Sequence, residues 1–82
     1  MTDDERRRAI HDLEATLRVG KGGVAAVADE LSTQLGERNL VKVKFLRAAR
    51  GGTDTEELAS ELAEQAGASV VETRGHTAVF ER

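Results

Sequence analysis

The stretch Arg18-Val19-Gly20-Lys21-Gly22-Gly23-Val24 places a glycine loop between a predicted strand and a predicted helix. Glycine lets a backbone turn tightly and approach a ligand without interference from a Cβ atom, and a G-x-x-G loop can hold a nucleotide backbone. The spacing matches neither a P-loop nor a dinucleotide-binding fingerprint. Two interpretations stay open. The loop is either a phosphate site, with Lys21 and the amides at the start of the next helix as ligands, or a plain helix entry.

The apolar residues around the loop predict its flanking elements. Leu17-Arg18-Val19 is typical of a short strand that ends at the glycines. After the loop, apolar residues recur at intervals of three and four, the pattern of an amphipathic helix. They are Val24, Val27, Leu31 and Leu35. We expect Gly36 or Asn39 to end this helix in a left-handed conformation.

Capping boxes predict two more helices. Thr2-Asp3-Asp4-Glu5 indicates a first helix that starts at about residue 3 and ends between Glu14 and Thr16. Thr53-Asp54-Thr55-Glu56 has the same spacing and indicates a third helix, which Gly67 closes. We interpret the acidic residues of this third helix as a solvated surface.

Residues 40–46 form the clearest strand, because Val41, Val43 and Phe45 alternate with Lys42 and Lys44. The alternation places the apolar side chains on one face and the lysines on the other.

Two further β-prone runs, 69–73 and 77–81, flank Arg74-Gly75-His76 and predict a terminal hairpin. The element order is then α-β-α-β-α-β-β. Helix crossovers between strands imply parallel pairing, and the hairpin adds an antiparallel pair. We therefore expect an α/β sandwich with a four-stranded mixed sheet and helices packed on it, forming one domain over residues 1–82.

The composition excludes several classes of protein. The absence of cysteine removes disulfides, cysteine metal sites and thiol nucleophiles, and fits a cytoplasmic protein. Two histidines make a zinc site improbable, and the longest apolar run, Val24 to Ala28, is too short to span a membrane. No nucleophile, base and orienting group can be assembled, so we expect no enzyme, no metal and no cofactor. The two aromatic residues, both phenylalanine, argue against an aromatic stacking platform.

The net charge of −3 at first argues against a polyanionic partner, but the charge is unevenly distributed. Residues 1–17 carry −2, residues 18–50 carry +4 and residues 51–82 carry −5. The basic third contains both the glycine loop and the lysine strand, so the chain can present a local positive face. That face would be cancelled if the acidic third helix lay beside it.

Four basic residues occur within nine positions without an acidic residue among them. They are Lys42, Lys44, Arg47 and Arg50. This run resembles a phosphate-facing stripe, although two lysines on a strand are also typical of a solvated face that blocks edge pairing. His76 is interpreted as a turn residue or, alternatively, as an RNA contact.

Three motifs, in this order and at this spacing, resemble the CRM domain, the YhbY-like RNA-binding module. They are Leu17 to Gly23, Asn39 to Lys44, and Ala68 to Thr77 followed by Val79 to Arg82. The resemblance implies a fold akin to the C-terminal domain of translation initiation factor three, a G-x-x-G loop used as in KH domains, and a link to precursors of the large ribosomal subunit. Its carried-over RNA-binding positions include Gly20 to Gly23, Lys42, Lys44, Arg74 and His76.

The resulting hypothesis is that the chain is a non-enzymatic, cytoplasmic RNA-binding protein. It would contact ribosomal RNA, together with ribosomal proteins, during large-subunit assembly. The candidate RNA-binding residues lie in the loop, the basic stripe and the late turn. They are Arg18, Gly20, Lys21, Gly22, Gly23, Lys42, Lys44, Arg47, Arg50, Arg74 and His76. The alternative is a protein-interaction module whose acidic third helix docks to a ribosomal or other basic protein.

Overall fold

Strand β2 (Val41–Phe45) is a central strand of a four-stranded sheet in the computed structural model, which describes residues 3–82. It pairs in parallel with β1 (Ala15–Val19) and antiparallel with β4 (Thr77–Glu81). Strand β3 (Ser69–Arg74) pairs antiparallel with β4, which gives the order β1-β2-β4-β3. The predicted mixed sheet and terminal hairpin are confirmed, and Gly75 adopts the positive φ (57°) that favours glycine in a tight turn.

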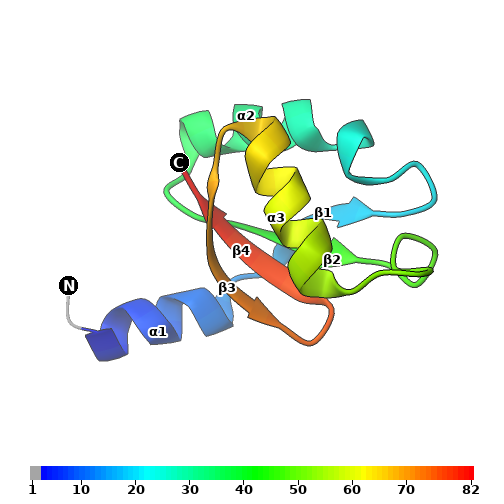
Figure 1. Ribbon diagram of the computed structural model, residues 1–82. Helices are drawn as coiled ribbons and strands as arrows, with labels where there is room; N and C mark the ends of the chain where they lie inside the picture. Colours follow the sequence, from blue (N-terminus) through cyan, green and yellow to red (C-terminus); the bar gives the residue numbers. More distant parts are fainter. Residues whose placement is uncertain (1–2) are drawn as a thin grey trace.

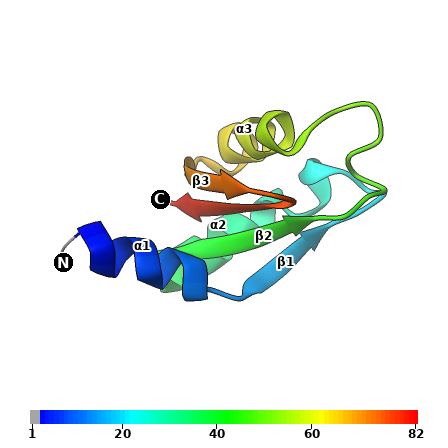
Figure 2. The same ribbon diagram turned by 90° about the horizontal axis from the view of Figure 1, so that it is seen from below.

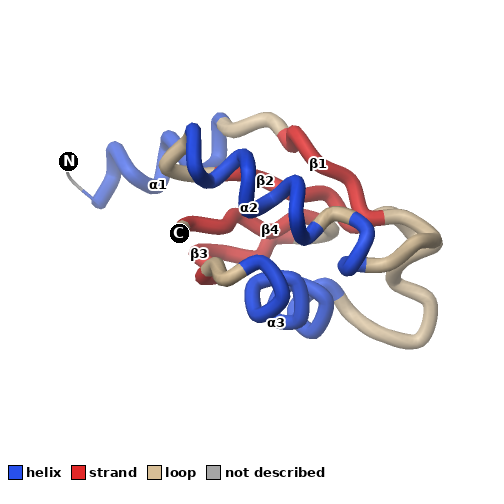
Figure 3. The backbone as a smooth tube through the Cα atoms, turned by 90° about the horizontal axis from the view of Figure 1, so that it is seen from above, coloured by secondary structure: helices blue, strands red, loops and turns tan. Residues whose placement is uncertain are grey.

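The helices form two unequal layers on this sheet. Helices α2 (Ala28–Glu37) and α3 (Thr55–Ala66) cover one face, as Figures 1 and 3 show. Helix α1 (Asp3–Asp12) lies across the opposite face, over the start of β2 (Figure 2). No helix in residues 3–82 is long and apolar enough to cross a membrane.

The main core lies between the sheet and the pair α2 and α3. Its largest buried side chains come from strands and helices alike: Phe45, Phe80, Leu31, Leu62, Val19, Val41 and Val43. On the other face, Ile10 of α1 and Val79 of β4 are buried outside this cluster. The core thus accounts for the apolar alternation of β2 and leaves its lysines on the α1 side of the sheet.

The helix after the glycine loop differs from the prediction. A short 3₁₀ turn, η1 (Val24–Ala26), precedes α2, and the two are separated at Val27. The expected left-handed end is wrong, because Arg38 leaves the helix in an extended conformation (φ −131°) that leads directly to β2. Gly36 lies inside the helix, and neither it nor Asn39 has a positive φ.

The ends of α3 and α1 can be compared with the caps that the sequence predicted. Asp54, and not Thr53, is the N-cap of α3, since its Oδ1 accepts from the Glu57 amide at 2.8 Å. Gly67 closes the helix in the left-handed conformation (φ 68°), as predicted. At the first helix, the predicted cap Thr2 lies outside the described residues, and α1 ends at Asp12, earlier than expected, because β1 already begins at Ala15.

Removal of the Asp54 cap is expected to destabilise the protein without unfolding it. Asp54→Ala leaves the Glu57 amide without its side-chain acceptor and should lower the free energy of unfolding by about 1 kcal/mol. Asp54→Asn keeps a capping oxygen and should change it by only a few tenths of a kcal/mol. Urea denaturation followed by circular dichroism measures both. Equal losses in the two variants would contradict the capping role.

Candidate nucleic-acid interface

A row of basic side chains crosses the sheet face that α2 and α3 leave open. In the strand register, Arg18 lies opposite Lys44, Lys44 opposite Thr77, and Thr77 opposite Arg74. Directly paired residues point to the same face, so Arg18, Lys44 and Arg74 form one line across four strands, here termed the basic row. Strands lie about 4.8 Å apart, so the row spans roughly 14 Å. All three basic side chains are exposed.

Two β-bulges bring these residues into line. On β1, Thr16 is an extra residue between Ala15, opposite Lys42, and Leu17, opposite Val43. Its hydroxyl donates to Gln34 of α2, which places it on the α2 side. A second extra residue, Val71, interrupts β3 in the same way. Each bulge shifts the face of the residues that follow it, and Arg18 and Arg74 consequently share the face of Lys44.

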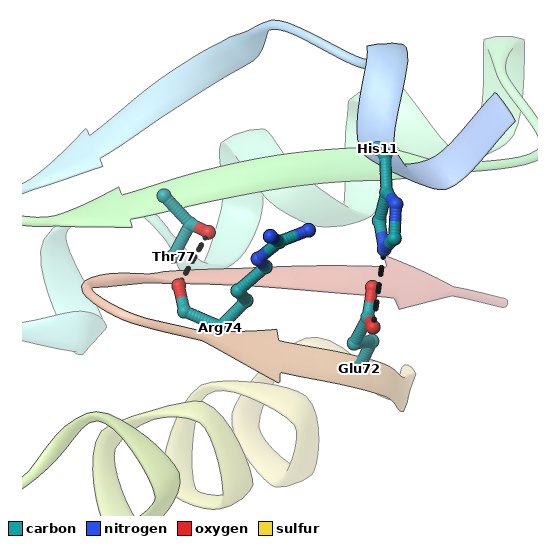
Figure 4. Close-up of polar contacts among 4 residues, drawn as sticks. All are labelled: His11, Glu72, Arg74 and Thr77. Atoms are coloured by element: carbon teal, nitrogen blue, oxygen red, sulfur yellow. Dashed lines mark hydrogen bonds and ion pairs between the residues drawn. The ribbon is translucent and has the colours of Figure 1, made fainter. Parts of the chain in front are cut away.

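Helix α1 covers the part of the open face next to the basic row. Lys42, which is half-buried, lies there opposite Val79. The imidazole of His11 approaches Glu72 to 3.6 Å (Nε2 to Oε1), and Figure 4 shows Arg74 extending from β3 toward the same space. Lys42 and these three side chains line a cleft of about 220 Å³. The spacing of apolar and polar residues does not predict the contact between His11 and Glu72.

The glycine loop lies at the carboxyl end of β1. The Gly23 amide donates to the Gly20 carbonyl at 3.0 Å, and Gly23 has a φ of 77° that favours glycine. Lys21 and Gly22 are exposed, and no backbone carbonyl within residues 3–82 accepts from their amides. The loop therefore presents two amides and one ammonium group to solvent.

The helix following the loop contributes less to anion binding than the sequence suggested. The loop runs into the three-residue turn η1, and α2 starts only at Ala28. Its first turn carries Asp29 and Glu30, which already occupy the positive end of the helix dipole. The contribution of a helix dipole to this loop is therefore smaller than the sequence suggested, because the loop leads into a three-residue turn and not directly into α2.

Arg47 and Arg50 have different environments, although the sequence placed them in one stripe with the lysines. Arg47 is exposed in the turn after β2. Arg50 is half-buried, and its Nε donates to the Phe45 carbonyl at 3.1 Å, which ties the loop to the end of β2. Arg50 thus holds the loop in place, while its terminal amino groups remain as donors.

The carboxyl ends of β1 and β2 and the β3–β4 turn lie at the same end of the sheet (Figure 1). The Leu46 amide donates to the Val19 carbonyl at 2.8 Å, and the Phe45 amide donates to the His76 carbonyl at 2.7 Å. These bonds bring together three segments that are far apart in the sequence. They contain Lys21, Arg47 and His76, all exposed.

The profile of the CRS1 / YhbY (CRM) domain matches residues 1–82. The chain belongs to this family. The Methanocaldococcus jannaschii protein MJ0652, named as a probable RNA-binding protein, is 43% identical over 70 residues, which cover 85% of this chain and 52% of that protein. The chain therefore spans about half the length of this curated relative.

A solved structure gives the same fold. The solution structure of SAV1595 from Staphylococcus aureus, described as a candidate RNA-binding protein, matches with a TM-score of 0.74 and 28% identity. The match covers 93% of this CRM domain and 78% of SAV1595. The α/β architecture that the sequence predicted is thereby confirmed.

The acidic helix of this CRM domain does not cancel the basic row. Helix α3 packs against the core face of the sheet, and the row occupies the opposite face. Glu57, Glu61 and Glu64 are exposed on the α3 layer. Two acidic residues are exceptions: Glu56 at the start of α3 lines a recess with Arg50 and Arg74, and Glu72 lies in the open-face cleft with Lys42 and Arg74. The other three glutamates of α3 lie away from Arg18 and Lys44, where the local positive charge is retained.

Three further residues line a recess beside the candidate site, although the sequence pattern does not single them out as binding residues. Thr53, Asp54 and Glu56 line a recess of about 480 Å³ together with Arg50, Arg74 and His76. The capping-box spacing placed a helix start within one residue of the observed N-cap, Asp54. The pattern could not show that the β3–β4 turn would face them, since that contact depends on the tertiary fold.

Proposed function

We propose that this CRM domain is a non-enzymatic RNA-binding protein that holds an RNA phosphate backbone along the basic row. The observation that carries the proposal is the register that aligns Arg18, Lys44 and Arg74 on the open face. Arginine and lysine contacts to phosphates fix the position of a nucleic acid and supply sequence-independent attraction. The names of both relatives agree with such a role.

In this proposal the RNA backbone runs on from the basic row to the glycine loop. Val19 ends β1 directly before Gly20, so Arg18 and Lys21 flank one corner of the sheet. The amides of Lys21 and Gly22 can donate to phosphate oxygens there, and Arg47 adds charge at the same end. Phe45 and Phe80 are both fully buried, so neither phenylalanine is available for stacking on the surface. Recognition then depends on the RNA backbone, on its shape and on polar side chains.

The partner in this proposal is ribosomal RNA of a large-subunit precursor in the cytoplasm. The CRM family supports it, because single-domain members are linked to such precursors. An acidic surface on the α3 layer favours a second contact with a basic ribosomal protein, in line with the alternative of a protein-interaction module. The two contacts use opposite sides of the sheet and do not exclude each other.

A substitution at Lys21 tests the loop. Lys21→Ala should reduce the slope of log K against log salt concentration by about 0.7 for single-stranded RNA, since one phosphate contact is lost. Lys21 is exposed, so the fold should not change. Fluorescence anisotropy at several salt concentrations measures the slope. The exposed Arg38, at the C-terminal end of α2, provides the control Arg38→Ala, which should leave the slope unchanged. An unchanged slope for Lys21→Ala would remove the loop from the binding site.

A further inference from the structure

The recess at the end of the sheet combines positive and negative groups at one place. It lies between the start of α3, the loop before it and the β3–β4 turn (Figure 1). Its volume of about 480 Å³ falls in the range of roughly 300–1,000 Å³ that is typical of small-molecule sites. A purely positive recess would suit a phosphate. This one also contains hydrogen-bond acceptors and therefore suits a ligand with donors as well.

The acceptors come from the N-terminal turn of α3. Asp54 uses Oδ1 to cap the helix through the Glu57 amide, and its second oxygen takes no part in that bond. A carboxylate can accept about four hydrogen bonds, so Asp54 keeps accepting capacity. Glu56, two positions later, is exposed and lines the same recess. Two carboxylates, one of them fixed by the cap, are thus available to a ligand that donates N–H groups.

The opposite wall consists of flat cationic or titratable side chains. Arg74 and His76 flank Gly75 in the hairpin turn, and both are exposed. An arginine plane or an imidazole ring can stack on an unpaired base. Arg50 is held at its Nε by the Phe45 carbonyl, which pre-orients its guanidinium group beside the recess.

Arg74 connects this recess to the basic row. It is the last residue of β3, ends the basic row opposite Thr77, and lines the recess. An RNA backbone that follows the basic row from Arg18 reaches Arg74 after roughly 14 Å. A nucleotide at that point can leave the stack and enter the recess, as occurs at single-stranded loops that proteins read.

We infer that the recess binds one unstacked RNA base that carries an exocyclic amino group, with Asp54 and Glu56 as acceptors and His76 and Arg50 as the stacking wall. The inference rests on the proposed RNA-binding function and adds base selectivity to it. Cytosine offers its N4 amino group to a carboxylate. Uracil has the same size but carries the O4 carbonyl in place of the N4 amino group, so an acceptor faces the carboxylates at that position and only N3–H remains as a donor.

The matched pyrimidines provide the test. The affinities of the full chain for the 12-nucleotide RNAs oligo(C) and oligo(U) are measured by anisotropy at pH 7.5 and the same salt concentration. The wild-type protein should bind oligo(C) about tenfold more tightly, as expected for one charged hydrogen-bonded contact. In the double variant Asp54→Asn and Glu56→Gln, the ratio should fall to within about twofold, because amides donate as well as accept. Asp54→Asn keeps the helix cap, so the fold is retained.

Glu61→Gln with Glu64→Gln is the control, since it removes the same two charges from exposed positions of α3 that do not line the recess. It should preserve the tenfold ratio. Equal binding of the two RNAs by the wild type would overturn the recess assignment while leaving RNA binding intact. An unchanged ratio in the double variant would overturn it as well. No binding of either RNA would reject the proposed function together with the inference.

Discussion

The double variant Arg18→Glu and Lys44→Glu is expected to bind single-stranded RNA at least about 100-fold more weakly than the wild type. The two residues are neighbours in the register of β1 and β2, and both are exposed. Each substitution removes a proposed phosphate contact and adds a repulsive charge to the basic row. Both side chains lie outside the core, so the free energy of unfolding should change by less than about 1 kcal/mol. Anisotropy titrations and urea denaturation measure the two quantities.

A matched control separates position from net charge. Arg38 and Arg82 line a shallow recess at the opposite end of the sheet, and both are exposed. Arg38→Glu with Arg82→Glu changes the net charge by the same amount as the basic-row variant. The long-range effect of net charge is screened beyond about 10 Å at ordinary salt, so this control should lose only a few-fold in affinity. Equal losses in both variants would contradict a localised site.

The substitution Phe45→Ala is expected to have the largest effect on stability. Phe45 is fully buried at the end of β2, and its truncation should cost about 3–5 kcal/mol. A chain of 82 residues has a total stability of about 4–12 kcal/mol, so the loss is a large part of the whole. The Phe45 backbone also bonds to His76 and Arg50, and RNA binding should weaken along with the fold. Urea denaturation at 25 °C measures the loss.

Leu46, the next residue in the chain, provides the control for the Phe45→Ala substitution. Leu46 is 36% exposed, and Leu46→Ala should cost less than about 1 kcal/mol. The two substitutions are adjacent in the sequence and differ mainly in burial. Similar losses for both would mean that the side chains at the end of β2 and in the turn after it do not divide between core and surface as described.

The strand elements of this fold could be predicted because each has a local cause. The alternation of Val41, Val43 and Phe45 with two lysines reports which face of β2 is buried, and the core confirms it. Gly67 and Gly75 both adopt positive φ at the ends where the sequence placed turns. The parallel pairing of β1 with β2 then followed from the helix crossover between them, and the family assignment agrees with the fold.

The basic row could not be predicted, because it depends on register and not on composition. Thr16 and Val71 are bulged residues, and the apolar–polar pattern of one strand does not state which residue of the neighbouring strand lies opposite. Without them Arg18 and Arg74 would not align with Lys44. For the same reason the sequence grouped Arg50 with the surface lysines, although its side chain is directed to the Phe45 carbonyl.

The split of charge between the two sides of the sheet explains how an acidic protein can offer a basic surface. Attraction to RNA depends on charges within about 10 Å of the phosphates at ordinary salt, and more distant acidic groups are screened. Glu57, Glu61 and Glu64 of α3 lie on the other side of the sheet from Lys44, while Glu56 lies at the end of the sheet and Glu72 on the open face. A local face of opposite sign can therefore coexist with a net charge of −3.

The most direct test of the central claim is a titration of the ¹⁵N-labelled chain with single-stranded RNA, followed by amide chemical shifts. The account predicts that the largest shifts occur at Arg18, Lys21, Gly22, Lys44 and Arg74, and that they decrease as salt is added. Shifts confined to the outer side of α3, at Ser60, Glu61 and Glu64, would contradict it and would place the RNA on the acidic layer.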